Sequence, residues 1–98
     1  MNSIESFPVR RSVPWRTLDT EALVVDVKSG LLYPLNSVGA RIWDLCDGAR
    51  SVDEIVGVLA AEFEAPEPTI RADAIEFIER LAYAKLVSIE GRRKGESR

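Results

Sequence analysis

The fold is decided by the stretch LLYPLNSVGARIW, residues 31–43, because its period changes in the middle. Residues 31–35 are apolar or aromatic, a composition that favours a β-strand. Asn36 can then cap the backbone amides of a helix. The apolar side chains that recur behind it at helical spacing are Val38, Ile42, Leu45 and Cys46. This stretch therefore predicts a strand that passes directly into a helix.

Upstream of this stretch the sequence predicts two further strands. β-Branched and aromatic residues are frequent in residues 13–18 and again in residues 22–27, and the polar Asp19-Thr20-Glu21 separates them. Asp26 can accept hydrogen bonds from the amides that follow it, and Gly30 can adopt the positive φ of a tight turn. We therefore expect three strands joined as an antiparallel meander.

Downstream the sequence predicts two further helices. Asp47-Gly48 is typical of a helix end, and Ser51-Val52-Asp53-Glu54 has the S-x-x-E spacing of a capping box before a helix that reaches Phe63. Ala65-Pro66-Glu67-Pro68 interrupts this pattern, and a third helix is expected to run to Ala84, because proline is tolerated in a first turn. The predicted fold class is α+β: a winged-helix-like domain with a three-stranded antiparallel sheet followed by three helices.

The ends of the chain carry no such patterns. Residues 1–12 show no periodicity and are predicted to be a flexible N-terminal segment. Residues 86–89 could add a short strand, and residues 91–98, rich in glycine and charge, are predicted to be a disordered tail. The folded domain is accordingly expected to span residues 13–90.

The composition excludes several classes of protein. A chain of 98 residues with 46% hydrophobic content can bury one core. No apolar run approaches the roughly 20 residues of a membrane span, and no secretory signal is present, so we expect a cytoplasmic protein. The chain has no histidine and a single cysteine, so we expect no metal site, no cofactor and no enzyme activity. The net charge of −3 argues against nucleic-acid binding.

The third predicted helix is unusually apolar on one side. Its core stripe comprises Ile70, Ala74, Phe77, Ile78 and Leu81. A flank beside that stripe comprises Arg71, Ile75, Ile78 and Ala82. If residues 31–35 form a sheet edge next to this flank, the strand and the helix enclose a groove that can accept a guest strand. The alternative is that Ile75 packs beneath the N-terminal segment.

Residues 24–87 resemble the PqqD family. The resemblance is carried by the run L-N-x-x-G-x-x-I-W at residues 35–43, by D-G at residues 47–48, by the turn that leads from Val25-Asp26 to Gly30, and by the helix start SVDEI. Family members recognise ribosomally made precursor peptides. The resemblance implies that the leader segment of a precursor adds as a strand to the third strand, with the third helix as the other wall. It also implies presentation to a modifying enzyme, such as a radical SAM maturase in the biosynthesis of pyrroloquinoline quinone (PQQ).

Carried over to this sequence, the resemblance implies a peptide-binding site and no catalytic residue. The implied contact residues are Leu31, Leu32, Tyr33, Pro34 and Leu35 on the strand, and Arg71, Ile75, Ile78 and Ala82 on the helix. Pro34 lacks an N–H, so one rung of the ladder must be missing on whichever side it faces.

Other conspicuous residues are interpreted as structural. We assign Asn36 to a helix cap, Gly39 to a close helix contact, Trp43 and Cys46 to the core, and Asp26 to its turn. Two rival functions remain for this fold: a winged-helix DNA-binding transcriptional regulator, and a docking domain for another protein. We expect a monomer or a weak homodimer.

Overall fold

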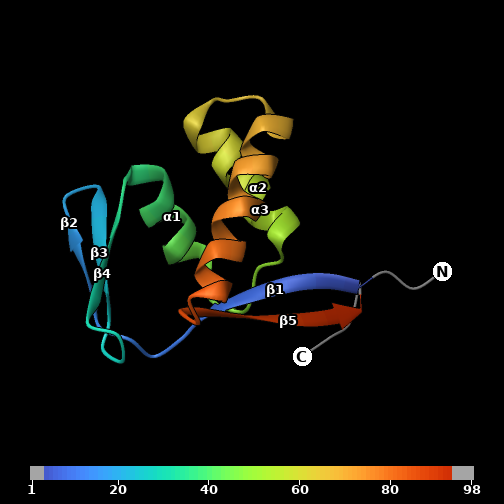
Figure 1. The fold of residues 1–98 in the computed structure, drawn as a ribbon. Helices are drawn as coiled ribbons and strands as arrows, with labels where there is room; N and C mark the ends of the chain where they lie inside the picture. The colour runs from blue at the N-terminus through green and yellow to red at the C-terminus, as the bar shows by residue number, and fades with distance from the viewer. Residues whose placement is uncertain (1–3, 94–98) are drawn as a thin grey trace.

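The computed structural model describes residues 4–93. Its elements are β1 (Ile4–Arg10), β2 (Trp15–Leu18), β3 (Glu21–Asp26), β4 (Leu31–Leu35), α1 (Ser37–Leu45), α2 (Val52–Phe63), α3 (Glu67–Tyr83) and β5 (Val87–Arg93). Strands β2, β3 and β4 form an antiparallel sheet in that order. The three helices lie on one side of this sheet, and β1 and β5 form a separate ribbon beneath them (Figure 1). The predicted fold class is confirmed.

Local sequence explains where the helices begin. The Asn36 side chain accepts a hydrogen bond from the Gly39 amide at 2.8 Å, so the predicted cap of α1 is confirmed. At the start of α2, Ser51 and Glu54 form both hydrogen bonds of a capping box. The predicted turn before β4 is also confirmed, since the Asp26 carboxylate accepts from the Lys28 amide at 3.1 Å and stays in the turn.

The core lies between the inner face of the sheet and the three helices. Val24 and Leu35 contribute from the sheet, Trp43 and Cys46 from the end of α1, and all four side chains are buried. The ring of Trp15 meets Trp43 edge to face at 6.1 Å between centroids. The structural interpretation of Trp43 and Cys46 is therefore confirmed.

The prediction of a flexible N-terminal segment is wrong for residues 4–10. These residues form β1, which pairs with β5 over its whole length, from Ile4↔Arg93 to Arg10↔Val87. Residues 91–93, predicted to belong to a tail, are the end of β5. Local composition could not indicate this ribbon, because its two strands are about 80 residues apart in the chain and are stabilised by each other. Residues 1–3 and 94–98 of the predicted flexible ends lie outside the described residues.

The ribbon is fastened to the rest of the molecule through the loop that follows α1. Pro8 is fully buried, and its carbonyl accepts a hydrogen bond from the Gly48 amide at 3.0 Å. The Arg10 amide donates to the Cys46 carbonyl at 2.9 Å, and the Arg10 guanidinium donates to the carbonyl of Trp43 at 2.9 Å. The β1–β5 ribbon is thus part of the folded unit. None of the helices within residues 4–93 has the length and hydropathy needed to cross a membrane.

Candidate functional site

Strand β4 is an edge of the sheet, and the direction of its backbone groups follows from its pairing. The Val25 amide donates to the Pro14 carbonyl on the β2 side, so the neighbouring Val24 turns its backbone toward β4. Backbone groups alternate along a strand, so Tyr33, which pairs with Val24, faces β3. Leu32 and Pro34 then present their backbone outward. This edge therefore offers two carbonyls and one N–H, because Pro34 has none.

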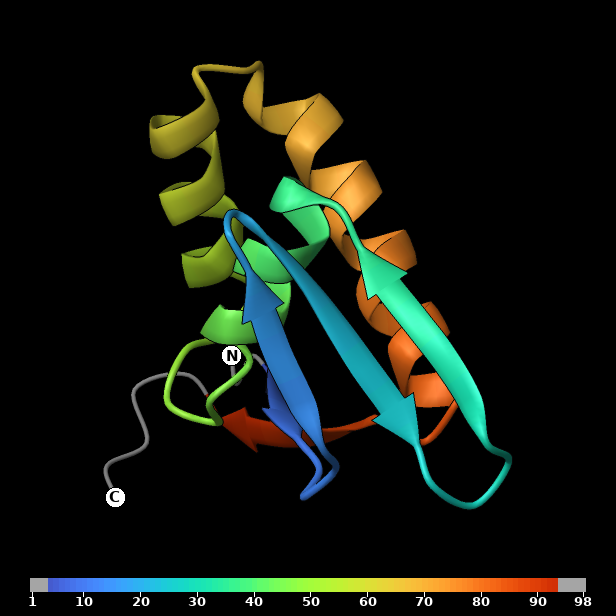
Figure 2. The same cartoon turned by 90° about the vertical axis from the view of Figure 1, so that its left-hand side faces the viewer.

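A cavity of about 400 Å³ adjoins this edge and makes it a groove. Its lining comes from three elements: Pro34 and Leu35 of β4, Asn36, Val38, Gly39 and Ile42 at the start of α1, and Asp73, Glu76, Phe77 and Arg80 of α3. Figure 2 shows β4 in front of α3 and leading into the start of α1. The residues nearer the beginning of β4, Leu31 and Leu32, are 56% and 59% exposed, which leaves them free to contact a ligand.

The floor of the groove depends on a close contact between α1 and α3. A Cβ atom on Gly39 would lie 3.0 Å from Cζ of Phe77 and 3.3 Å from Oδ1 of Asn36. Any side chain at position 39 would therefore displace the Phe77 ring or the helix cap. The predicted close helix contact of Gly39 is confirmed, and the same contact positions the aromatic wall of the groove.

Charged side chains surround the upper part of this groove. Asp73 and Glu76 bring two carboxylates, and Arg80 pairs with Glu76 at 3.6 Å across one helical turn. Within residues 4–93 Asp73 takes part in no ion pair. An apolar floor with a mainly acidic rim suits an apolar side chain that is flanked by positive or neutral groups.

The structure corrects the predicted helix wall, because the flank chosen from the sequence faces away from β4. Arg71, Ile75 and Ile78 line a different cavity, of about 290 Å³, together with Glu5 and Ser6 of β1 and Ile89 of β5. Ala82 shares that flank by helical spacing and does not line the groove at β4. Ile75 is 36% exposed and lies on the side of the N-terminal segment that the alternative named, since it lines this cavity together with Glu5 and Ser6. Arg71 is held by ion pairs with Asp53 and Glu67, which raise its pKa further above its usual range.

The residues that sequence reasoning missed lie on the opposite flank of α3. Asp73, Phe77 and Arg80 follow one another at spacings of four and three, so a helical wheel already groups them. A helical wheel shows one core stripe with a flank on each side of it. It does not show which flank lies beside β4, because that depends on how α1 and α2 place α3 in the fold. The strand half of the predicted site does adjoin the groove, through Pro34 and Leu35.

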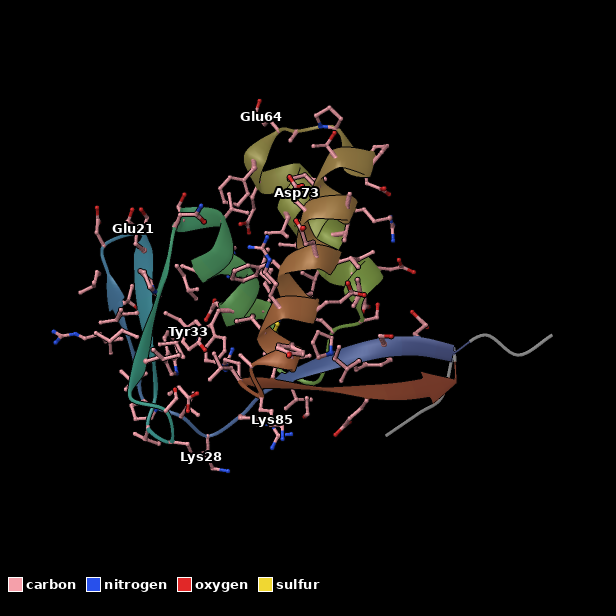
Figure 3. The ribbon with its side chains drawn as sticks, in the orientation of Figure 1. Glu21, Lys28, Tyr33, Glu64, Asp73 and Lys85 are labelled. Carbon is pink, nitrogen blue, oxygen red and sulfur yellow. The ribbon has the colours of Figure 1, made fainter. Side chains whose placement is uncertain are left out.

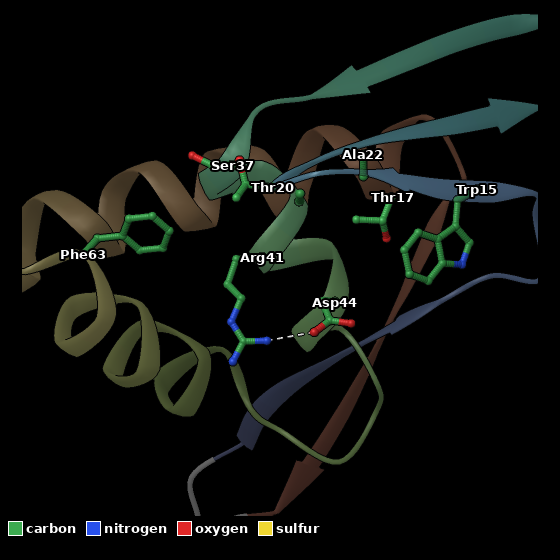
Figure 4. Close-up of a pocket in the computed structure, with 9 residues that line it drawn as sticks. Trp15, Thr17, Thr20, Ala22, Ser37, Arg41, Asp44 and Phe63 are labelled. Carbon is green, nitrogen blue, oxygen red and sulfur yellow. Dashed lines mark hydrogen bonds and ion pairs between the residues drawn. The ribbon is translucent and has the colours of Figure 1, made fainter.

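A third cavity, of about 560 Å³, lies at the opposite edge of the sheet (Figure 4). Trp15 of β2, Asp44 and Arg41 of α1 and Phe63 of α2 are among its lining residues. The Arg41 guanidinium is already engaged, by Asp44 at 2.8 Å and by Glu62 at 2.8 Å, so its charge is neutralised within the protein. Strand β2 is also an edge, and by the same alternation Thr17 turns its backbone outward there. A substitution at the edge of β2 can therefore serve as a control for the same substitution at the edge of β4.

The chain matches one protein family over more than half of its length. Residues 21–87, more than half of the 98 residues, match the family described as Coenzyme PQQ synthesis protein D (PqqD). The matched range begins at β3 and ends at the first residue of β5. The β1–β5 ribbon and β2 therefore lie almost entirely outside the matched residues.

Comparison with individual proteins gives two similarities. The PqqA binding protein of Rhodopseudomonas palustris (strain HaA2) is 40% identical over 47 residues, which are 48% of this chain and 46% of that protein, so the match spans less than half of the relative's length. The solved structure of TbiB1 in complex with the TbiA(beta) leader peptide has a TM-score of 0.72 at 26% sequence identity, over 92% of this chain and 99% of TbiB1.

Proposed function

Because this chain belongs to the PqqD family, we propose that it is a non-catalytic module that captures the leader segment of a ribosomally made precursor peptide on β4. The leader adds as a strand to the outer edge of β4 and lays one side chain into the groove between β4, α1 and α3. The module then presents the precursor to a modifying enzyme, for which a radical SAM maturase is the first choice. The proposed location is the cytoplasm.

The observation that carries the proposal is an open sheet edge beside an apolar groove. Leu32 and Pro34 direct their backbone groups outward from the edge of β4, and Phe77 of α3 lines the groove beside that edge. Recognition by strand addition takes its affinity from the backbone and its specificity from pockets for alternate side chains. The similarity to TbiB1, solved with a leader peptide, and to a relative named for binding PqqA, supports a peptide as the guest.

From this geometry we expect a complex of moderate strength. The edge of β4 supplies one donor and two acceptors within its five residues, and ordering a flexible leader has an entropy cost. We therefore expect a dissociation constant on the order of 10⁻⁷ to 10⁻⁶ M. Such a complex releases the modified product readily. The DNA-binding alternative gains no support, because the groove side of α3 carries Asp73 and Glu76.

The test compares proline substitutions at the two edges of the sheet. Leu32→Pro removes the only outward N–H of β4, and Thr17→Pro removes an outward N–H from β2, so neither breaks a hydrogen bond inside the sheet. Fluorescently labelled PqqA from Rhodopseudomonas palustris and the TbiA(beta) leader serve as probes in anisotropy titrations. We expect Leu32→Pro to weaken binding of the better probe about tenfold or more, because it removes a hydrogen bond and changes the edge sterically. Thr17→Pro should change binding less than about twofold.

The opposite pattern would overturn the proposed site. If Thr17→Pro weakens the complex and Leu32→Pro does not, the guest lies at β2 beside the cavity of Trp15 and Phe63. If the wild-type protein binds neither probe at about 100 μM, at least about a hundred times the expected dissociation constant, the proposed function itself is wrong. Far-UV circular dichroism and thermal unfolding of both variants establish that they are folded.

A further inference from the structure

A cluster of positive side chains lies at the end of the molecule where β4 begins and α3 ends. A cavity of about 560 Å³ there is lined by the turn before β4, the residues after α3 and the segment between β1 and β2. Its charged lining residues are Arg10, Arg11, Asp26, Lys28 and Lys85. Figure 3 shows Lys28 and Lys85 near each other at this end, with Tyr33 above them and Asp73 farther along α3.

Two of these five charged groups are already engaged. The Arg10 guanidinium donates to the carbonyls of Trp43 and Asp44, and its Cζ lies 5.7 Å from the centre of the Trp15 ring. The Asp26 carboxylate accepts from the Lys28 amide at 3.1 Å and from the Ser29 hydroxyl at 2.8 Å. The hydroxyl hydrogen bond is the main reason that the pKa of Asp26 is lowered, so this carboxylate is ionised and committed to its turn.

The other three cations form no ion pair within residues 4–93, although the charge of Lys28 helps to lower the pKa of Asp26. Arg11, Lys28 and Lys85 are exposed and take part in no ion pair in that part of the chain. Three cations outside any ion pair around one cavity stand out in a chain whose net charge is −3. Lys85 moreover has a φ of 62°, a left-handed conformation that favours glycine after a helix. A charged side chain therefore occupies a position at which the backbone conformation favours glycine.

The groove and the basic cavity have no lining residue in common, but the chain connects them directly and their charges are opposite. Strand β4 leads from the turn that contains Lys28 to Leu35, which lines the groove with Asp73 and Glu76. The helix α3 runs back from Asp73 to the residues just before Lys85. The four residue steps of β4 span about 13 Å. That distance exceeds the screening length of about 8 Å at physiological salt, so a guest strand meets two separate charged ends.

We propose that this charge separation selects and orients the guest: the leader carries an acidic residue at the end of its added strand that lies over Arg11, Lys28 and Lys85. A neutral or basic residue lies at the end near Asp73 and Glu76. The inference rests on the proposed function and adds to it the chemical class of the leader and its direction along β4. Backbone pairing alone permits both parallel and antiparallel addition, and the two charged ends remove this ambiguity.

The test begins with the probe that binds wild-type protein in the anisotropy assay. Charge reversals Lys28→Glu and Lys85→Glu are compared with Arg16→Glu, which makes the same change in net charge on an exposed residue of β2. At about 20 mM salt we expect each lysine reversal to weaken binding about fivefold, and Arg16→Glu less than about twofold. At about 0.5 M salt the differences should fall below twofold. Lys85→Gln separates the loss of charge from the effect of a carboxylate at a helix end, and should weaken binding about two- to threefold.

Direction is measured with a nitroxide label on either end of the bound peptide. The label next to the acidic end should broaden the amide signal of Lys85, and the label on the other end that of Asp73. The inference is overturned if wild type binds while all lysine variants bind equally well, or if the labels broaden the signals in the reverse order. It is also overturned if the bound peptide has no acidic residue near the Lys28 end. These outcomes leave leader capture intact, whereas failure of wild type to bind removes both proposals.

Discussion

The Cys46 thiol is enclosed by the core, and its ionisation is coupled to unfolding. Burial raises the pKa of this thiol to about 12, from about 9 in an exposed position. The unfolded chain therefore loses the thiol proton at lower pH than the folded chain. The contribution of this thiol to stability is complete below pH 9 and is lost as the pH rises from 9 toward 12.

We expect the free energy of unfolding to fall above pH 9 by up to about 1.4 kcal/mol per pH unit through Cys46. Urea titrations of wild type and Cys46→Ala between pH 8 and about 11 isolate this slope, because the other groups titrate in both proteins. Native protein at pH 8 should also resist thiol reagents until it unfolds. Rapid labelling of native Cys46 would show that the thiol is accessible.

Gly39 connects the stability of the fold to the shape of the groove. In Gly39→Ala, the better helix propensity of alanine, about 1 kcal/mol, is offset by the contact of its Cβ with Phe77 and Asn36. We expect the unfolding free energy to change by less than about 1 kcal/mol while peptide affinity falls several-fold, because Phe77 must move. Thermal unfolding and anisotropy measure the two effects, and an unchanged affinity would mean that the Phe77 ring is not part of the binding wall.

At the scale of elements, the two flanks of α3 line two different cavities. The flank with Phe77 lines the groove at β4, and the flank with Ile75 lines a different cavity together with residues of β1 and β5. We expect Phe77→Ala to weaken leader binding about tenfold and to lower stability by roughly 1–3 kcal/mol, whereas Ile75→Ala should leave binding within about twofold and cost less stability, because Ile75 is 36% exposed. Parallel anisotropy and urea titrations distinguish the flanks. Equal loss of affinity in both variants would contradict this division.

Most of the elements could be predicted because their signals are local. The cap at Asn36, the capping box at Ser51 and the turn at Asp26 each rest on a side chain that bonds the backbone within three residues. The strand side of the candidate site, residues 31–35, comes from the family resemblance and stays a prediction, although Pro34 and Leu35 do line the groove. The helix side could not be predicted, because periodicity gives the core stripe of α3 without telling which of its flanks turns to β4. The β1–β5 ribbon escaped prediction because its pairing is entirely long-range.

At the scale of the whole molecule, the β1–β5 ribbon joins the two ends of the described chain beneath the helices. Pro8 is buried against the loop after α1, and Gly48, with a φ of 81°, places its amide on the Pro8 carbonyl. A Cβ on Gly48 would lie 3.0 Å from Cγ2 of Val9. The ribbon is therefore fastened at a position that requires glycine for both its backbone angle and its space.

We expect Gly48→Ala to lower the free energy of unfolding by about 1–3 kcal/mol, since it combines left-handed strain with a clash against Val9. Gly30→Ala is the matched control: its φ of 77° is also positive, but a Cβ there meets no atom within 4 Å. The difference between the two variants in urea titrations measures the contact with β1. Equal destabilisation would mean that β1 does not press on this loop.

Pro34 has a consequence for the unliganded protein. A strand that waits for a partner is a hazard in a crowded cell, since identical edges can stack on one another and grow into cross-β fibrils. Such stacking needs every rung to repeat from layer to layer, and a ring nitrogen without hydrogen leaves one rung empty in each layer. The proline thus lets the edge stay vacant between successive guests without nucleating an assembly of its own kind.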